Sequence, residues 1–528
     1  MKDKQQIELS PEELDGLIQR LDAGTLTEKD HEVIKALIDA FLMLSRAAQD
    51  KDARINKLLR MLFGAKTEKA DKILPSNPES DKTDEKSEDK DTGDKTKGHG
   101  RNGACAYTAA EKIAVPYAGL KPGGNCPLCP NGKVYPWEPG TVVRFTGGAP
   151  LQAKIWELEK LRCNLCGEIF TPQLPEQAGA EKYDESAGAM VALLRYGSGV
   201  PFNRIEQLQE SMGIPLPAST QWDIVKKIAA PETAASAVHG ELGRQGAQGN
   251  VIHNDDTPMK ILSMIKAEDD ERKGIFTTGL LSIVNGRKIV MFKTGRKHAG
   301  ENITDLLKLR DRNLGPPLQM CDALSRNISK AFETIVCNCM SHARRNFVDV
   351  VNSFPEECGH VIETLAVVYK NDETAKEQNM TPQKRLLYHQ AQSGPIMEGL
   401  FAWMNNQMDG RKAEPNSGLG KAIYYMLNHW EPLTRFLRVE GAPLDNNICE
   451  RALKMAILHR KNSLFYKTLR GARVGDIFMS LIHTCRLSNV NPFDYLVALQ
   501  KHSAEACRNP QDWLPWNYTA AANLLQPV

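Results

Sequence analysis

The sequence lacks a long apolar run and a secretion signal, and each absence narrows what the protein can be. No window of its 528 residues approaches the roughly 18 consecutive apolar residues of a membrane span, so no membrane partner is predicted. The opening residues MKDKQQIELS have no apolar core of the kind that directs secretion. Both features predict a cytoplasmic location, where the 12 Cys act as thiols or metal ligands rather than as a disulfide framework.

A strong excess of one charge is also missing. With 67 Lys and Arg against 65 Asp and Glu, the net charge is only +2, so any affinity for nucleic acid must come from local clusters. Hydrophobic residues make up 41% and charged residues 25%, as in a globular protein. At about 150 residues per domain, the length predicts three or four domains, and there is no internal repeat.

Residues 1–70 are predicted to form a helical arm. Apolar residues recur there at heptad a and d spacing, which favours a coiled-coil seam, although a helix packed on its own domain is the alternative. These apolar positions are Ile34, Leu37, Phe41, Leu44, Ala48, Ile55, Leu58 and Leu62. Residues 71–104 follow with almost no apolar side chains and are predicted to be a disordered, charged linker.

Residues 105–176 contain two Cys pairs, Cys126-Pro-Leu-Cys129 and Cys163-Asn-Leu-Cys166. Each pair turns two thiolates toward one centre, and two pairs supply the four sulfurs of a tetrahedral zinc site. A redox role is the rival interpretation, but the thioredoxin-like βαβ pattern is missing around both pairs. The sequence therefore predicts a small zinc-binding domain with one structural Zn²⁺.

Residues 177–245 are helical in pattern. Two helices, at about 204–212 and 219–228, are separated by the breaker GIPLP, and the spacing is compatible with a DNA-binding helix-turn-helix and equally with an ordinary helical hairpin. Strand-like runs then alternate with helix from about residue 246 to 500, which is an α/β pattern. The strand-like runs are 251–252, 275–284, 289–292 and 318–321, and helical patterns fill 350–440 and 445–499.

Acidic residues stand at three points of this region. Asp255 and Asp256 end a strand in VIHNDDTP, Asp322 ends the run LQMCD, and Glu450 begins a helix in LDNNICERALKMAILHRKN. Taken singly, each is a cap, a turn residue or a surface acid; together they are able to converge on two Mg²⁺ ions, which prefer oxygen ligands. Neighbours in a strand point to opposite faces, so only one of Asp255 and Asp256 can take part.

Basic residues follow the last of these acids. Seven Lys and Arg and no acid lie between Arg451 and Arg473, a pattern that fits contacts to a phosphate backbone and also a solvated basic face. His342-Ala-Arg344-Arg345 forms a second basic cluster. The nearby Cys337 and Cys339 are interpreted as core thiols beside a surface His342, rather than as a second metal site.

The chain resembles the transposases of the insertion sequence 66 family over almost its whole length. The resemblance is carried, in order, by LLRMLFGAKTEK, CPLCPNGKVY, LEKLRCNLCGEIFTP, KYDESAGAMVALLRYGSGVPFNRIEQLQ, VIHNDDTPMKIL, MSHARRNF and LDNNICERALKMAILHRKNSLF. It implies a multidomain α+β protein with a zipper-like arm, a zinc domain and a ribonuclease-H-like DDE catalytic domain at 246–500. A helical insertion at about 350–440 would interrupt that domain, and a tail at 501–528 would follow it.

The catalytic acids transfer by motif. The family pattern His-Ala-Asp-Glu-Thr matches residues 253–257 and identifies Asp255, with Asn254 departing from the pattern. Asp322 aligns in MCDALSRN, and Glu450 matches the Glu of Asp-Asn-Asn-x-x-Glu-Arg. The resemblance implies that Asp255 and Asp322 hold two Mg²⁺ and that Glu450 completes the shell of one.

The sequence thus predicts a nucleoid-associated transposase that cleaves the ends of a bacterial insertion sequence and transfers the 3′-hydroxyls to target DNA. DNA contacts are predicted for the basic residues His342, Arg344, Arg345, Arg451, Lys454, Arg460 and Lys461. Joining two ends calls for at least a homodimer, and the resemblance implies accessory proteins from the same element. The alternatives are a non-catalytic DNA-binding relic and another ribonuclease-H-like nuclease.

Overall fold

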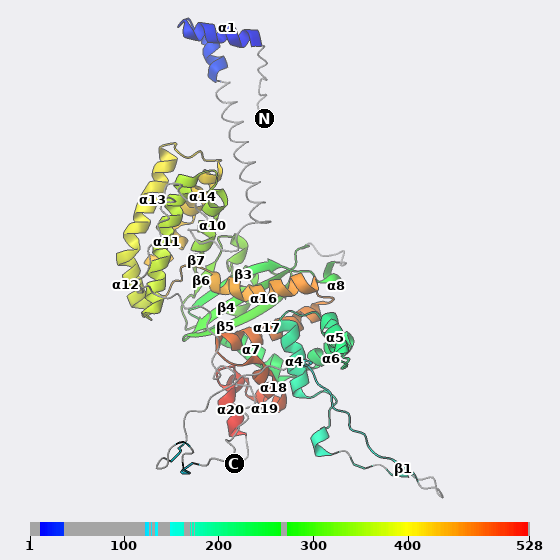
Figure 1. Ribbon diagram of the computed structural model, residues 1–528. Helices are drawn as coiled ribbons and strands as arrows, with labels where there is room; N and C mark the ends of the chain where they lie inside the picture. Colours follow the sequence, from blue (N-terminus) through cyan, green and yellow to red (C-terminus); the bar gives the residue numbers. More distant parts are fainter. Residues whose placement is uncertain are drawn as a thin grey trace. The chain divides into compact units, whose positions relative to one another are not determined.

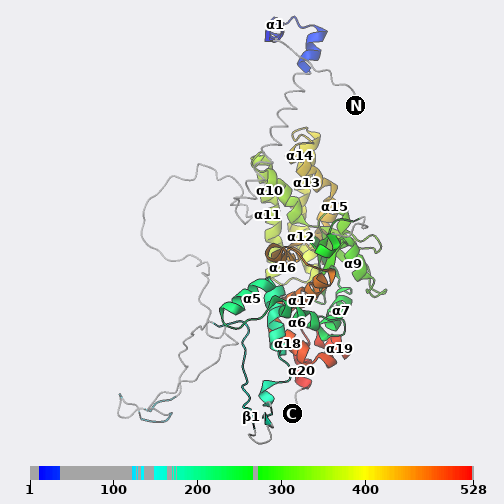
Figure 2. The ribbon, with the colours of Figure 1, turned by 90° about the vertical axis from the view of Figure 1, so that its right-hand side faces the viewer.

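The computed structural model divides the chain into two units, Met1–Ser76 with Leu151–Val528, and Asn77–Pro150 (Figures 1 and 2). The residues that it describes are 11–35, 122–125, 128, 133–135, 148–162, 169–170, 172–173, 175–265 and 272–525. Among the helices in these residues, none combines the length and the apolar character that crossing a bilayer requires.

A mixed five-stranded sheet lies at the centre of the larger unit, in the order β5-β4-β3-β6-β7. β3, β4 and β5 form an antiparallel meander, and β6 and β7 run parallel to β3. The strands are β3 (Val251–Pro258), β4 (Phe276–Val284), β5 (Arg287–Gly295), β6 (Leu318–Cys321) and β7 (Ile335–Asn338). The α+β class is confirmed, and β7 is the strand that the sequence pattern missed.

The β4–β5 hairpin follows from its two turn residues. Asn285 and Gly286 both have positive φ, 49° and 79°, which is the requirement of the tight turn that matches the twist of paired strands. Helices cover the sheet on both sides, so the strands are buried along most of their length. α16 (Asn447–Ser463) packs on β3 and β4, and α9 (Ala299–Leu307) contacts the same two strands.

The outer edge of the sheet is covered by α17 (Leu469–Leu487), which runs beside β5. Backbone N–H groups of Val290, Phe292 and Thr294 donate to side chains of Thr484, Ser480 and Asp476, at 3.1, 2.9 and 2.7 Å. The three donors are two residues apart on β5, a rise of about 6.8 Å, and the three acceptors are four residues apart on α17, a rise of about 6 Å. The donors and the acceptors therefore have nearly the same spacing. The hydrogen-bonding groups of an exposed edge strand are thereby satisfied inside the molecule.

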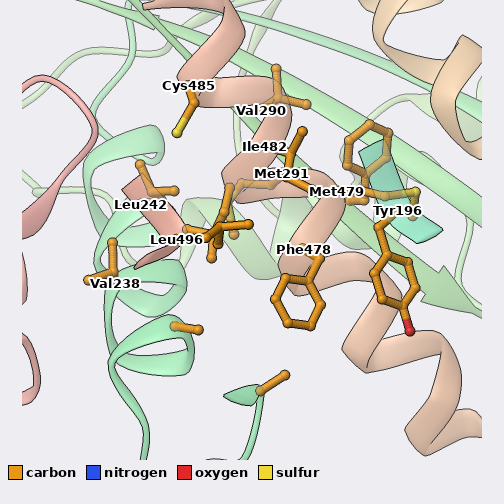
Figure 3. Close-up of a cluster of buried hydrophobic side chains, with 14 of the residues drawn as sticks. Tyr196, Val238, Leu242, Val290, Met291, Phe478, Met479, Ile482, Cys485 and Leu496 are labelled. Atoms are coloured by element: carbon orange, nitrogen blue, oxygen red, sulfur yellow. The ribbon is translucent and has the colours of Figure 1, made fainter. Parts of the chain in front are cut away.

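One hydrophobic core joins the sheet to helices before and after it. Val238 and Leu242 on α7 pack in the same cluster as Val290 on β5 and Phe478 on α17 (Figure 3). The region at 177–245 therefore shares a core with the sheet. Its elements are η2 (Glu176–Ala178), α4 (Glu185–Ala192), η3 (Leu193–Gly197), α5 (Phe202–Ser211), α6 (Ala218–Ile228) and α7 (Ala234–Gly246), and the short α8 (Leu262–Ile265) follows β3.

A second core lies on the β6–β7 side, where α10 (Met340–Val350) packs against the helices that follow it. A series of helices occupies residues 355–437 (Figure 1). These are α11 (Pro355–Glu377), α12 (Pro382–Gln392), α13 (Gly394–Asp409), α14 (Gly418–Asn428), α15 (Trp430–Leu433) and η5 (Arg435–Leu437). The chain then returns to the sheet through α16.

The segment after residue 500, expected to be a tail, is folded. It comprises α19 (Ser503–Arg508), η6 (Pro510–Trp513) and α20 (Tyr518–Leu524), and follows α18 (Pro492–Lys501). Trp513 is buried, and its carbonyl accepts a hydrogen bond from the Tyr495 hydroxyl at 2.8 Å. The apolar side chain of Trp513 thus belongs to the main core.

The predictions of a helical arm and of a zinc-binding domain fall largely outside the residues that the structure describes. The arm is not one continuous helix, because α1 (Pro11–Asp22) ends before Gly24, whose φ is +65°, and helix resumes at residue 28. The heptad positions from residue 37 on, the linker at 71–104 and all four predicted zinc ligands lie outside the described residues. The second Cys pair falls between β1 (Leu161–Arg162) and β2 (Ile169–Phe170), which are paired antiparallel.

Candidate active site

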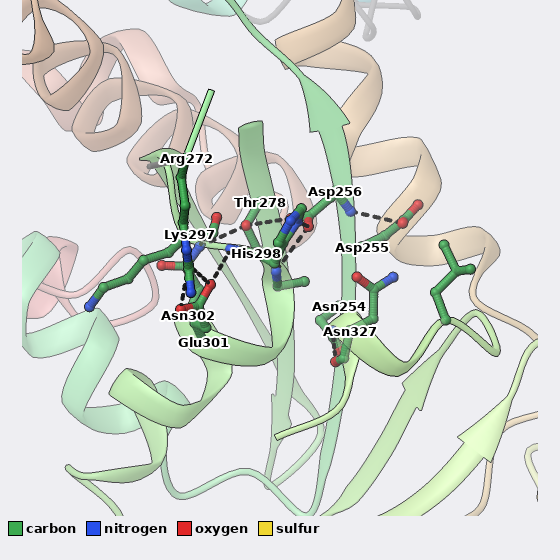
Figure 4. A network of polar contacts seen from close by, with 12 residues as sticks. Asn254, Asp255, Asp256, Arg272, Thr278, Lys297, His298, Glu301, Asn302 and Asn327 are labelled. Carbon is green, nitrogen blue, oxygen red and sulfur yellow. Dashed lines mark hydrogen bonds and ion pairs between the residues drawn. The ribbon is translucent and has the colours of Figure 1, made fainter. Parts of the chain in front are cut away.

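Asp255 and Asp256 are adjacent on β3 and point to opposite faces of the sheet (Figure 4). The Asp256 carboxylate is 4% exposed and accepts hydrogen bonds from the Thr278 hydroxyl at 2.5 Å and from the backbone N–H of Ala299 at 2.9 Å. Its Oδ2 lies 3.2 Å from Nδ1 of His298. Asp256 therefore fastens the N-terminus of α9 to the sheet and is occupied there.

Asp255 faces the other side, where Asp322 joins it through the register of two parallel strands. His253 on β3 pairs with Met320 on β6, and the two aspartates each stand two residues beyond that pair. Their side chains therefore lie at the same level and on the same face. Asp322 is held in place by Asn327, whose side-chain amide donates to its carboxylate at 2.5 Å.

Glu450 comes from the first turn of α16, which Asn446 anchors to β3. The Asn446 side chain donates to the carbonyl of Asn254 at 3.1 Å, and its Oδ1 lies 3.1 Å from Nδ1 of His253. Close approach of the helix also depends on Gly279 of β4, the partner of Asp255, where a Cβ would come within 3.0 Å of Leu453. The helix N-terminus and its anchor thus bring Glu450 to the residues that flank Asp255.

The electrostatics of Asp255 reflect the other two acids. Burial and, to a lesser extent, the negative charges of Asp322 and Glu450 together raise the pKa of Asp255 to about 7, against a lowering by the Asp256 N–H. A carboxylate whose pKa is raised by burial and by neighbouring negative charges lacks positive charge nearby. An all-oxygen, anionic donor set is what Mg²⁺ or Mn²⁺ binds, so these residues fit the divalent cations expected for the site.

The ligand atoms of these three acids are not all within 4.8 Å of one another. In the part of the chain that the structure describes, the group that meets this spacing is Cys339, His342 and Glu450. The wider spacing of Asp255, Asp322 and Glu450 would suit more than one divalent cation, which would supply positive charge to the reacting phosphate.

The predicted basic residues lie on two helices. Arg344 and Arg345 are half-buried on α10, and Arg451, Lys454 and Lys461 are exposed on α16. Arg460 has another contact, because its Nη1 donates to the Thr257 hydroxyl at 2.9 Å and to the Pro258 carbonyl at 2.6 Å. Arg460 therefore ties the C-terminal half of α16 to the end of β3.

His342 lies beside the acids and not on an open surface. Its Nδ1 is 3.6 Å from Oε1 of Glu450, and both atoms are buried without a hydrogen-bond partner. The interpretation of Cys339 and His342 as a core thiol beside a surface histidine is thus wrong for the histidine. The spacing Cys339-x-x-His342 was the signal in the sequence, since it puts both side chains on one helical turn.

The α5–α6 helix pair was equally compatible with a helix-turn-helix and with an ordinary helical hairpin. Gln221 on its second helix is buried, and its side-chain amide donates to the carbonyls of Leu216 at 2.8 Å and Phe202 at 3.1 Å. Its amide nitrogen holds the turn between the two helices, and the buried side chain is not available to read bases. Sequence reasoning also missed Asn327 and Asn446, the two residues that position the acids.

The sequence is similar to those of known proteins over the region that contains this site. The sequence profile of the transposase IS66 family matches residues 181–474, which include all three acids. Three uncharacterized proteins of Sinorhizobium fredii are similar: y4jD (32% identical over 34% of this chain and 36% of its own), y4qI (28%, over 35% and 34%) and y4hP (24%, over 69% and 68%). The chain thus spans about a third of the length of the first two. Because the profile covers more than half of the sequence, the chain belongs to the IS66 family of transposases.

Proposed function

We propose that the protein is an active DDE transposase, which cleaves phosphodiester bonds at the ends of its element and joins the freed 3′-hydroxyls to target DNA. The observation that carries the proposal is that Asp255, whose pKa burial raises to about 7, also feels the negative charges of Asp322 and Glu450 on the same face of the sheet. The sheet order β5-β4-β3-β6-β7, in which the antiparallel strands β3, β4 and β5 come first in the chain, supports a ribonuclease-H-like catalytic domain.

The three acids would hold two divalent cations. Such cations supply the positive charge that activates an attacking oxygen and stabilises the leaving oxygen of a phosphodiester. The contribution of the chain is to fix the acids before DNA arrives: Asn327 orients Asp322, and Asn446 sets the position of α16 and hence of Glu450. Fixed positions lower the barrier because little reorganisation is left for the reaction itself.

Exposed cations on α16 extend the site toward DNA. Lys454 lies one helical turn after Glu450, so both side chains are on the same side of the helix. We assign Lys454 and Arg451 to the phosphates next to the scissile bond, where they neutralise charge without reading sequence.

The chemistry is balanced without a protein nucleophile. In cleavage, an oxygen of water forms the new bond to phosphorus and the 3′-oxygen leaves with a proton. In joining, that 3′-hydroxyl attacks a target phosphodiester, so one ester bond replaces another. Two ends must be handled together, which calls for at least two copies of the chain. The DNA substrate places the protein with the chromosome in the cytoplasm.

The test uses full-length protein, Mg²⁺ and a plasmid carrying the two DNA segments that flank the gene. We expect nicks at the element ends and joined products, and a loss of roughly 100-fold or more in Asp255→Asn, Asp322→Asn and Glu450→Gln. Asp311→Asn, an exposed acid outside the cluster, is the matched control. Full activity in any of the three variants removes that residue from the site. Cutting without joining indicates a nuclease, and DNA binding without cutting indicates a relic.

A further inference from the structure

Three side chains of metal-binding type meet beside the acid face. Cys339 is the N-cap of α10, His342 is in its first turn, and Glu450 is in the first turn of α16. Their sulfur, nitrogen and oxygen atoms all lie within 4.8 Å of one another. Two helix starts, far apart in the sequence, therefore point three different donor types at one place.

The separation of His342 and Glu450 is that of two ligands of one ion and not that of hydrogen-bond partners. The 3.6 Å between His342 Nδ1 and Glu450 Oε1 is too long for a hydrogen bond, and both atoms are buried without another partner. Buried polar atoms without partners are costly and rare, so the pair calls for a further group. Neighbouring ligands of a tetrahedral Zn²⁺ are about 3.5 Å apart, given metal–ligand distances of 2.0–2.3 Å.

The sulfur of Cys339 accepts hydrogen bonds from two backbone N–H groups. The backbone N–H of Asn446 donates to Sγ of Cys339 at 3.2 Å, and the backbone N–H of His342 donates to the same atom. These donors oppose the effect of burial, which raises the pKa of the Cys339 thiol to about 11, so the positive charge of a bound cation would be needed to hold the thiolate. The neighbouring Cys337 differs, because its thiol acts as a donor, to the Ile335 carbonyl at 3.7 Å.

We propose that Cys339, His342 and Glu450 bind a thiophilic divalent cation of the zinc class, at a site distinct from the all-oxygen cluster of Asp255 and Asp322 and sharing Glu450 with it. Sulfur and imidazole donors select such a cation and disfavour Mg²⁺. One thiolate, one carboxylate and a neutral imidazole balance its charge, the Cys339 thiol releasing its proton to solvent on binding. Three protein ligands leave a fourth position open.

The inference goes beyond the proposed function and does not depend on it, because it is tested by metal binding alone. Full-length protein is stripped of metal, reloaded with Zn²⁺, dialysed, and its zinc per chain is measured. Co²⁺ then serves as an optical probe, since a thiolate ligand gives it a charge-transfer band. The four cysteines predicted to bind zinc elsewhere contribute equally to every variant, so the differences between variants are decisive.

We expect His342→Ala and Cys339→Ser to lose one zinc per chain, or to bind it at least tenfold more weakly, and to lose part of the Co²⁺ band. Cys337→Ser, a buried thiol two residues away, and Asp255→Asn, a carboxylate of the all-oxygen cluster, should keep the full amount. Equal zinc in wild type and His342→Ala overturns the proposal. A parallel loss in Cys337→Ser also overturns it, because the effect is then one of folding.

Thermal unfolding of each metal-free variant shows whether it is folded, so that a loss of zinc can be assigned to the missing ligand. The His342 side chain is 25% exposed, so we expect His342→Ala to fold like the wild type without metal. Asp255→Asn separates this proposal from the preceding one, since it should stop DNA cleavage and retain the zinc. His342→Ala should lose the zinc, and this result does not depend on whether the variant cleaves DNA.

Discussion

Asp255 and Asp256 are neighbours on one strand, yet only Asp256 is saturated with partners. The Asp256 carboxylate accepts hydrogen bonds from Thr278 and from the N-terminus of α9 and contacts His298. Asp255 instead faces the negative charges of Asp322 and Glu450. Asp255 thus destabilises the cation-free protein, whereas Asp256 stabilises it. Their substitutions should have opposite effects on folding.

For Asp255→Asn, we expect a cation-free protein that is more stable than the wild type at pH 8. The folded-state pKa of Asp255 is about 7, above the value of 3.8 for an unperturbed carboxyl, so the folded protein binds more protons between these values. The stability that the group contributes is therefore present below pH 4 and lost as the pH rises through 7. Asn removes this loss, which is on the order of 2–4 kcal/mol.

Thermal unfolding at pH 5 and pH 8, with and without Mg²⁺, measures this effect. The wild type should gain more from Mg²⁺ at pH 8 than Asp255→Asn does, because the cation neutralises the same repulsion. An Asp255→Asn protein that is less stable than wild type at pH 8 would contradict the assignment.

For Asp256→Ala, the expected change is a loss of stability with the cation response retained. The substitution removes the acceptor for Thr278 and for the α9 N-terminus in a buried setting, which costs about 2–4 kcal/mol. Urea unfolding measures the loss. A Mg²⁺-induced rise in melting temperature as large as that of the wild type shows that Asp256 is outside the cation site.

Asn446 and Asn447 provide a matched pair on α16. Asn446 is buried and bonds to β3 and to Cys339, whereas the Asn447 side chain bonds to Asp445 only two residues away. We expect Asn446→Ala to cost about 2–3 kcal/mol and to reduce DNA cleavage, and Asn447→Ala to cost less than about 1 kcal/mol. Equal losses in denaturant unfolding would mean that the anchor to β3 does not set the position of α16.

Asp476 gives a prediction far from the acid cluster. Its full burial raises its pKa to about 7, while hydrogen bonds from Thr294 oppose the rise. The sign is the same as for Asp255, so the stability that it contributes falls as the pH rises from 4 to above 7. Asp476→Asn keeps an acceptor for the Thr294 N–H, and its stability relative to wild type should increase between pH 5 and pH 8. A difference that does not change with pH would refute the shifted pKa.

The sequence pattern predicted the parts of the fold that repeat regularly. Alternating and continuous apolar runs predicted β3 to β6, and acids at strand ends and at a helix start indicated Asp255, Asp322 and Glu450 as candidates. Their catalytic role comes from the family resemblance and stays a prediction. β7 is only four residues long and carries no clear alternation, so it was missed. Asn446 and Asn327 were missed because buried amides that hold other residues look like ordinary turn residues until their partners are known.

The histidine shows the same limit from the other side. His342 is closely followed by Arg344 and Arg345 in the sequence, which suggested an exposed side chain in contact with DNA. Its surroundings are set by Glu450, a residue more than a hundred positions later on α16. Pairing across that distance depends on the whole path through α11 to α15, which local spacing does not encode.

The helix laid along β5 has a consequence for assembly. Because α17 already occupies the outward N–H groups of Val290, Phe292 and Thr294, a strand from another copy finds no template on that side of the sheet. Copies of the chain that assemble on two DNA ends, as we propose, would then recognise each other through other surfaces, and the β5 border cannot seed a continuous intermolecular ribbon.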